Sequence, residues 1–182
     1  APYGGIYITH MRSEADKFLE SMDEAIEIGQ RSGAPVEIYH LKGAGKRNWH
    51  KPALAIAKID SARSAGLDVS ADMYPYTAGG TGLSAVLPPW ASADGKLLEN
   101  ISDPEMRVKI KSEVLNQQTE WENLGALCTP EGIMIAGVRN EANQKWVGKR
   151  LSEVAAEMGK DWVDTAMDLL LSDSSRVGAL YF

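Results

Sequence analysis

The chain has 182 residues, 44% of them hydrophobic and 24% charged, with a formal net charge of −6. This length and composition are typical of a globular protein with one sizeable core. The acidic balance and the lack of a basic stripe argue against a nucleic-acid partner, and no apolar run approaches the roughly 20 residues of a membrane span. A single cysteine, Cys128, excludes an internal disulfide, so we expect a reducing, cytoplasmic location.

Three apolar runs have the alternating pattern of strands, and each carries polar residues near its end. They are 5–12 with His10 and Arg12, 35–42 with His40 and Lys42, and 67–74 with Asp72 and Tyr74. In α/β folds, functional groups lie at the C-terminal ends of parallel strands. The repeat therefore predicts that these side chains converge at one rim.

Helical patterns separate the three runs. Residues 13–32 begin with Ser13 and Asp16 in capping positions, continue with an apolar stripe at 3.6-residue spacing, and end at Gly33. Residues 51–65 have good helix formers throughout. The order β-α-β-α-β over the first 76 residues favours a parallel sheet.

Beyond the third run, Gly79-Gly80-Thr81-Gly82 is typical of a loop whose backbone comes close to a ligand. Asp103 is expected to open a helix that runs to about Asn123. The remaining predicted elements are a strand at 132–138, helices at 151–158 and 162–171, and a strand at 177–182.

Spacing alone leaves the roles of the polar residues open. His40 with Lys42 suits a metal or acid–base role, and equally suits a core histidine beside a solvated lysine. Arg12 is placed to pair with Glu14, which would make it structural. Asp72 is buried by pattern and needs a partner, either a backbone N–H or a catalytic group. Three histidines without a His-x-His pair are few for a binuclear metal centre.

Several longer strings follow one another at telling intervals. They are Thr9-His10-Met11-Arg12-Ser13-Glu14, His40-Leu41-Lys42, Asn48-Trp49, residues 72–83, and Leu87-Pro88-Pro89-Trp90, followed by 148–155 and 179–182. This order resembles the N-acyl-D-amino-acid deacylases (D-aminoacylases), metal-dependent (β/α)₈ hydrolases of the amidohydrolase superfamily. The resemblance covers nearly the whole chain and is most specific over residues 1–90.

The resemblance implies roles for individual residues. His40 would be a zinc ligand in the catalytic centre, and Lys42 would bind the free α-carboxylate of the substrate. Tyr74 stands where some relatives carry a metal-binding histidine, and it would hydrogen-bond the carboxylate or the developing oxyanion. Gly80 stands where relatives often carry serine, so one hydroxyl contact with the substrate is expected to be missing.

His10 and Arg12 belong to a string characteristic of the family and are expected among the substrate-binding residues, without a firmer role. The implied activity is hydrolysis of a small-molecule N-acyl-D-amino acid, with zinc activating the attacking water. The family's His-x-His pair is missing, as are a bridging ligand from an early strand and an aspartate from the last strand. We therefore expect an inactive piece of the enzyme, completed by the remainder of the barrel from a longer parent protein.

The expected fold class is α/β, a partial TIM-like (β/α)₈ barrel with parallel strands and an α-rich insertion. Residues 1–90 would supply barrel βα units, 91–150 a mostly helical insertion with a short strand, and 151–182 returning barrel helices with the start of a late strand. Two other functions remain open: a non-catalytic α/β domain that binds a small carboxylate ligand, and another amidohydrolase that acts on cyclic amides. A nucleotide-binding domain would need a Gly-x-Gly-x-x-Gly turn after the first strand, which is missing.

Overall fold

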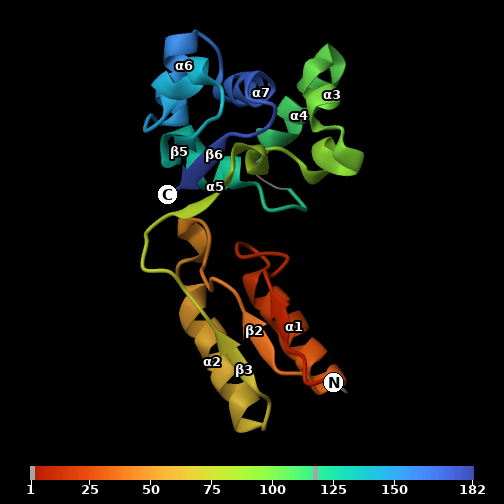
Figure 1. The fold of residues 1–182 in the computed structure, drawn as a ribbon. Coiled ribbons are helices and arrows are strands. Elements are labelled where there is room, and N and C mark those ends of the chain that lie inside the picture. The colour runs from red at the N-terminus through yellow and green to blue at the C-terminus, as the bar shows by residue number, and fades with distance from the viewer. Residues whose placement is uncertain (1–2, 117–118) are drawn as a thin grey trace. The chain divides into compact units, whose positions relative to one another are not determined.

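The computed structural model describes residues 3–116 and 119–182, and the chain divides into two compact units, 1–75 and 76–182. Each unit has its own small sheet and its own hydrophobic core (Figure 1). The elements of the first unit are β1 (Tyr7–Thr9), α1 (Phe18–Ser32), β2 (Val36–Ile38), the 3-10 turn η1 (Lys46–Asn48), α2 (Lys51–Ser64) and β3 (Val69–Ala71).

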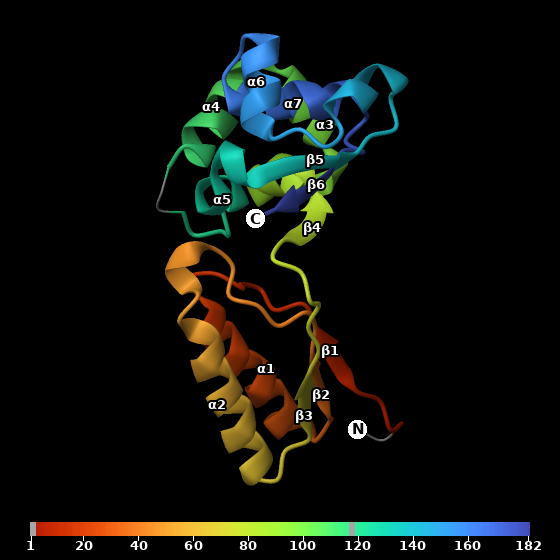
Figure 2. The same ribbon diagram turned by 90° about the vertical axis from the view of Figure 1, so that its left-hand side faces the viewer.

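The first unit is a β-α-β-α-β repeat with a parallel sheet in the order β1-β2-β3, as predicted. Both helices lie on the same face of this sheet (Figure 2). The buried face of β2 carries Val36 and Ile38, which pack with Phe18 and Met22 of α1. Within the described residues of the first unit, no helix lies over the opposite face, and the side chain of Ile8 is correspondingly exposed.

The apolar stripe predicted for the first helix is confirmed. Phe18, Met22, Ala25 and Gly29 are all buried. A Cβ atom added at Gly29 would come within 2.5 Å of Cγ2 of Val36, so glycine allows α1 to approach β2 closely. Its end is also as predicted, with Gly33 in the left-handed conformation.

The predicted start of this helix is wrong, because α1 begins at Phe18 and not near Ser13. The hydroxyl of Ser13 accepts hydrogen bonds from the backbone N–H groups of Ala15 and Lys17 in a turn that precedes the helix. Asp16 does not complete a capping box, since its carboxylate pairs with Arg47. A long-range ion pair therefore replaces the local cap.

The second unit is built from more numerous and shorter elements. They are β4 (Gly79–Gly82), η2 (Leu83–Val86), η3 (Pro89–Gly95), α3 (Leu97–Ser102), α4 (Pro104–Val114), α5 (Leu124–Gly132), β5 (Ile133–Gly137), η4 (Glu141–Trp146), α6 (Leu151–Met158), α7 (Trp162–Ser172) and β6 (Gly178–Tyr181). The predicted ranges of α6 and α7 agree with the structure to within one residue.

The sheet of the second unit is antiparallel, in the order β4-β6-β5, which corrects the expectation of parallel strands throughout. Its central strand β6 is the apolar run predicted near residue 177. The predicted glycine loop is a strand as well: Gly79 to Gly82 form β4 and pair with β6. The expectation of a loop there is wrong, because the four residues form a ladder with Gly178–Tyr181. Contact between this segment and a ligand stays a prediction.

The helix expected from Asp103 to about Asn123 is shorter than predicted. Asp103 does cap it, accepting from the backbone N–H groups of Glu105 and Met106, but α4 ends at Val114. Residues 117–118 of the predicted helix lie outside the described residues. Asn123 begins the next helix, α5, because its side chain accepts from the backbone N–H of Ala126.

Among the described residues, none of the helices combines the length and apolar character that crossing a membrane requires.

Candidate functional site

The site lies in the first unit, where the chain leaves the C-terminal ends of the parallel strands. Thr9 of β1 is paired with Ile38 of β2, so His10 and His40 follow neighbouring strand ends. The strand β2 stops at Ile38 because His40 adopts a positive φ of 39°. The backbone N–H of His40 donates to Oδ1 of Asp72 at 2.6 Å, which holds this turn against the end of β3.

The two imidazole rings meet edge to face. Nδ1 of His10 lies 3.1 Å from Nε2 of His40, and the ring centroids are 4.9 Å apart with an interplanar angle of 69°. The side chain of His10 is 62% exposed and that of His40 is 31% exposed. The pair is thus open to solvent on one side, as a site that admits a ligand must be.

Glu14 lies next to both rings and is buried, with only 7% of its side chain exposed. Its Oε1 is 2.7 Å from Nδ1 of His40 and 3.6 Å from Nδ1 of His10. Its Oε2 accepts from Nζ of Lys42 at 2.6 Å. A buried carboxylate is costly unless it is paired, and here it faces one cation and two imidazoles.

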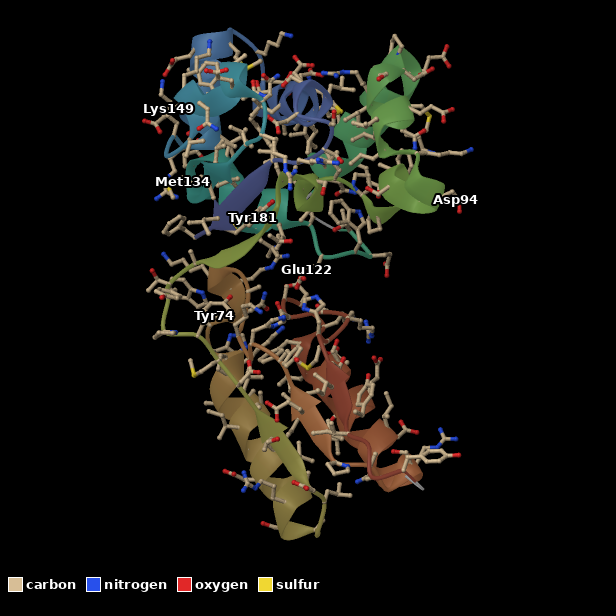
Figure 3. All side chains as sticks on the ribbon, viewed as in Figure 1. Tyr74, Asp94, Glu122, Met134, Lys149 and Tyr181 are labelled. Atoms are coloured by element: carbon tan, nitrogen blue, oxygen red, sulfur yellow. The ribbon has the colours of Figure 1, made fainter. Side chains whose placement is uncertain are left out.

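Lys42 contacts the same ring nitrogen of His40 as Glu14 does. Its Nζ lies 2.8 Å from Nδ1 of His40 and donates to the carbonyl oxygen of the same residue at 2.8 Å. The ammonium also stands 5.6 Å from the ring centroid of Tyr74, which follows β3 (Figure 3). Burial, together with the negative charge of Glu14, raises the pKa of Tyr74, so its phenol keeps its proton at neutral pH.

The structure brings His10, His40, Lys42 and Tyr74 together but places other predicted site residues elsewhere. Arg12 turns toward α1, where its Nε donates to Glu24 at 2.8 Å; the predicted pairing of Arg12 with Glu14 is therefore wrong.

Gly80 lies in β4 of the second unit, opposite Leu180, and its role in substrate binding stays a prediction.

Asp72 and His50 complete the comparison with the sequence. The alternating pattern predicts a buried Asp72, whereas the structure has it exposed. Its expected partner, a backbone N–H, is confirmed in His40. His50 is exposed and precedes α2.

Sequence reasoning missed two features of the site. The sequence patterns indicate Glu14 only as a partner for Arg12, and His10 only as a substrate contact. The four-residue spacing of His10 and Glu14 was a signal, but it indicates adjacency only in a helix, and this segment precedes α1. Their approach depends instead on the turn at Ser13, which sequence patterns did not reveal.

The arrangement has the donor set of a metal site. Among the described residues, His10, Glu14 and His40 each offer one ligand atom, and these atoms all lie within 4.8 Å of one another. Imidazole nitrogens and carboxylate oxygens are typical ligands of divalent transition metals. The cation of Lys42 beside them suits an anionic group of a ligand.

Comparisons with known proteins bear on this geometry. No family model matches the chain. Two curated proteins of Alcaligenes xylosoxydans xylosoxydans are similar to it: an N-acyl-D-glutamate deacylase, 38% identical over 81 residues, and a D-aminoacylase, 41% identical over 79 residues. These matches cover 44% and 43% of this chain, and the chain spans only 17% and 16% of the two relatives.

A solved structure is similar over the whole chain. It is the crystal structure of the N-acyl-D-glutamate deacylase from Bordetella bronchiseptica, complexed with zinc and a phosphonate inhibitor that mimics the tetrahedral intermediate. The TM-score is 0.67 at 23% identity, and the match covers 100% of this chain and 28% of that one. At this identity the likeness establishes the fold alone.

The first unit is therefore an α/β protein with a candidate metal site at the ends of its parallel strands. The sequence matches and the similar fold show that the chain is related to the N-acyl-D-amino-acid deacylases. It spans less than a third of the length of these relatives.

Proposed function

We propose that the chain forms part of a zinc-dependent hydrolase that cleaves the amide bond of N-acyl-D-amino acids to give a D-amino acid and a carboxylate. The observation that carries the proposal is the meeting of His10 and His40 beside the ammonium of Lys42. The relatives are deacylases of N-acyl-D-glutamate and of D-amino acids by name, which supports the substrate class.

The two histidines fit a zinc ion. Tetrahedral zinc with Zn–N distances of about 2.0–2.1 Å holds two imidazole nitrogens about 3.3 Å apart. The separation of Nδ1 of His10 and Nε2 of His40, 3.1 Å, is close to that value. His10 and His40 would thus hold the metal, which when bound supplies a Lewis acid and a more acidic water molecule. His10 is thereby proposed as a metal ligand in addition to His40.

The carboxylate of the substrate would be bound by Lys42 and Tyr74. The ammonium is a compact cation at the edge of the site, with its side chain 27% exposed. Tyr74 keeps its phenolic proton, because its pKa is raised, and can therefore donate a hydrogen bond to a carboxylate or oxyanion. Holding this end of the substrate would place the acyl amide near the metal and select one enantiomer.

The three parallel strands also fit part of a (β/α)₈ barrel. In such a barrel, helices cover the outer face of the strands and side chains of the inner face fill the interior. Here both helices lie on one face of the sheet (Figure 2). On the other face Glu37 of β2 lies between its strand partners, Ile8 of β1 and Ser70 of β3. We propose that the inner face is completed by further barrel strands of a longer protein.

Metal binding by the chain tests this proposal directly. Zinc titration of residues 1–182 by calorimetry is expected to show binding that His10→Ala and His40→Ala each weaken more than about 100-fold, since loss of an outer-shell partner alone costs 10–100-fold. His50→Ala is the matched control, because His50 is an exposed histidine outside the site. No zinc binding by the unaltered chain, or equal losses in all three variants, would overturn the proposal.

The chain alone is expected to release no D-amino acid from an N-acyl substrate, because its sequence lacks the His-x-His pair and the late aspartate of the family. Metal-dependent release by residues 1–182 would contradict the view that it is only part of the enzyme. The alternative, a carboxylate-binding domain without metal, predicts that binding of N-acetyl-D-glutamate survives His40→Ala and is unaffected by zinc.

A further inference from the structure

We infer that the ammonium of Lys42 is fully hydrogen-bonded in the metal-free chain, and that a metal ion bound to His40 releases one of its protons for the carboxylate of a ligand. This order of binding, metal first and carboxylate second, rests on the proposed function for the identity of both ligands. The contacts that carry it lie among Glu14, His40 and Lys42 and do not depend on that function.

Three acceptors surround Nζ of Lys42. They are Oε2 of Glu14 at 2.6 Å, Nδ1 of His40 at 2.8 Å and the backbone carbonyl oxygen of His40 at 2.8 Å. An ammonium group has three N–H donors and no acceptor, so these three contacts use all of its protons. A carboxylate that enters the metal-free site therefore has to compete with one of them before Lys42 can donate to it.

The contact with Lys42 defines the state of the His40 ring. Because an ammonium only donates, Nδ1 of His40 has to accept, and the neutral ring carries its proton on Nε2. Nε2 lies 3.1 Å from Nδ1 of His10, to which it then donates. Oε1 of Glu14 is also close to Nδ1, at 2.7 Å, but the hydrogen bond that the structure gives this nitrogen comes from Lys42.

A metal ion on His40 is incompatible with this hydrogen bond, whichever ring nitrogen binds it. In a neutral imidazole one nitrogen carries the proton and only the other can accept a hydrogen bond or bind a metal. A metal on Nε2 requires that Nε2 lose its proton and that Nδ1 gain one, so the ring stays neutral but Nδ1 no longer accepts from Lys42. A metal on Nδ1 takes the same lone pair directly. Either way, one proton of the ammonium is released.

The ammonium is the part of the site that is able to adjust. The backbone N–H of His40 is held by Asp72 at 2.6 Å, and the carbonyl oxygen of Glu14 accepts from the N–H of Ala44 at 2.7 Å. Lys42, by contrast, carries its charge on a flexible four-carbon stem. Without its contact to Nδ1, the ammonium keeps two acceptors, Oε2 of Glu14 and the carbonyl oxygen of His40, and its third proton becomes available to a carboxylate.

Metal and carboxylate therefore favour each other's binding, and by linkage each strengthens the other by the same factor. The positive charge of the metal attracts a carboxylate in any case, so the share that comes from Lys42 has to be separated from it. Lys42→Met makes this separation, because it removes the ammonium and leaves the candidate metal ligands His10 and His40 in place.

Long-range 1H–15N NMR of the unaltered chain, at about pH 8 and with and without zinc, reads the state of His40 directly. The chain contains three histidines, and exposed His50 is an internal reference. Without metal we expect the proton of His40 on Nε2. With zinc we expect Nδ1 to be either protonated or bound to the metal. This measurement needs no variant, so it holds even if Lys42→Met does not fold.

Zinc titration by calorimetry, with and without N-acetyl-D-glutamate, measures the coupling. We expect the carboxylate ligand to raise the zinc affinity of the unaltered chain about fivefold or more, and the gain in Lys42→Met to be at least about fivefold smaller. Zinc alone should bind Lys42→Met several-fold more tightly, because no ammonium competes for His40. Lys58→Met, which removes a lysine from an exposed ion pair with Asp23, is expected to behave as the unaltered chain does.

The outcomes separate the order of binding from the proposed function. If zinc binds through His10 and His40 but the gain from N-acetyl-D-glutamate is equal in the unaltered chain and in Lys42→Met, the release of Lys42 is refuted and the metal site stands. A metal-free chain with the proton of His40 on Nδ1 has the same meaning, since Lys42 would then have nothing to release. No zinc binding at all would refute both.

Discussion

The ion pair between Lys42 and Glu14 allows a quantitative test of how the site is held together. Lys42→Met removes the ammonium but keeps a side chain of similar length, so Glu14 is left buried without its cation. Removing one partner of a buried pair costs about 3–5 kcal/mol. Because the Lys42 side chain is 27% exposed and Nδ1 of His40 remains beside Glu14, we expect a cost below this range, about 2–3 kcal/mol of unfolding free energy.

The double variant Glu14→Gln/Lys42→Met removes both charges. Replacing a whole buried pair by uncharged groups is often close to neutral, so we expect it to cost about 1 kcal/mol or less. The double variant should therefore be about 1–2 kcal/mol more stable than Lys42→Met alone, a departure from additivity that is expected of contacting residues. Lys58→Met is the matched control: Lys58 and Asp23 are also 2.6 Å apart, but the pair is exposed, and such pairs contribute about 0–1 kcal/mol.

Amide hydrogen exchange is the appropriate assay, because a chain with two compact units need not unfold in one step. The N–H of Val36, which donates to the carbonyl of Asp68 at 2.8 Å within the sheet of the first unit, reports the opening of that unit. If Lys42→Met lowers its protection no more than Lys58→Met does, or if the double variant is as unstable as the single one, the pair is not a buried one and the reasoning fails.

Three further predictions concern the second unit. Burial alone would raise the pKa of Asp173, but hydrogen bonds from Asn143 and from the backbone N–H groups of Arg139 and Asn140 hold that pKa below its usual value. The stabilising effect of the ionised Asp173 carboxylate is therefore present above about pH 4 and is lost as the pH falls through the folded-state pKa. Asp173→Asn should lower the free energy of unfolding, measured in urea, by about 1.5–3 kcal/mol at pH 7 and by progressively less below pH 4. Asp103→Ala, which removes the cap of α4, should cost about 1 kcal/mol in the same assay. Burial raises the pKa of Cys128 to about 11, so iodoacetamide should label it far more slowly at neutral pH than an unstructured cysteine peptide, as mass spectrometry would show.

The sequence was sufficient for the parts of the fold that depend on local pattern. The stripe of α1 and the range of α6 follow from 3.6-residue periodicity, and the parallel order of β1, β2 and β3 follows from the length of the crossovers. The meeting of His10 and His40 was predictable for the same reason, since equivalent positions after neighbouring parallel strands lie side by side. The location of the protein in the cell stays a prediction.

Features that depend on distant partners were not predictable from local pattern. Asn123 donates to the carbonyl oxygen of Val114 at the end of α4 and also caps α5, so one side chain divides what the composition suggests is a single helix. The glycines of β4 have low strand propensity, yet they pair with β6, a hundred residues later in the chain. Asp72 is exposed because burial depends on what covers a sheet face, which alternation alone does not reveal.

The same limit applies to the candidate site and explains why its central acidic residue was missed. The patterns around His40 predicted a strand continuing to Lys42, whereas the chain turns at His40 with a positive φ, a conformation that non-glycine residues adopt only when their surroundings fix it. Here the N–H of His40 is held by Asp72, its carbonyl oxygen by Lys42, and its ring lies against Glu14 and His10.

One of these contacts, from Lys42, comes from the same loop as His40. The others come from the residue after β1, from the turn before α1 and from the end of β3, so no single segment of sequence contains them all. Because they set the orientation of the His40 ring before any ligand arrives, binding a metal there would require little further ordering. The strain at one backbone position is thus offset by contacts from three separate segments, and this makes His40 the residue on which the geometry of the whole site depends.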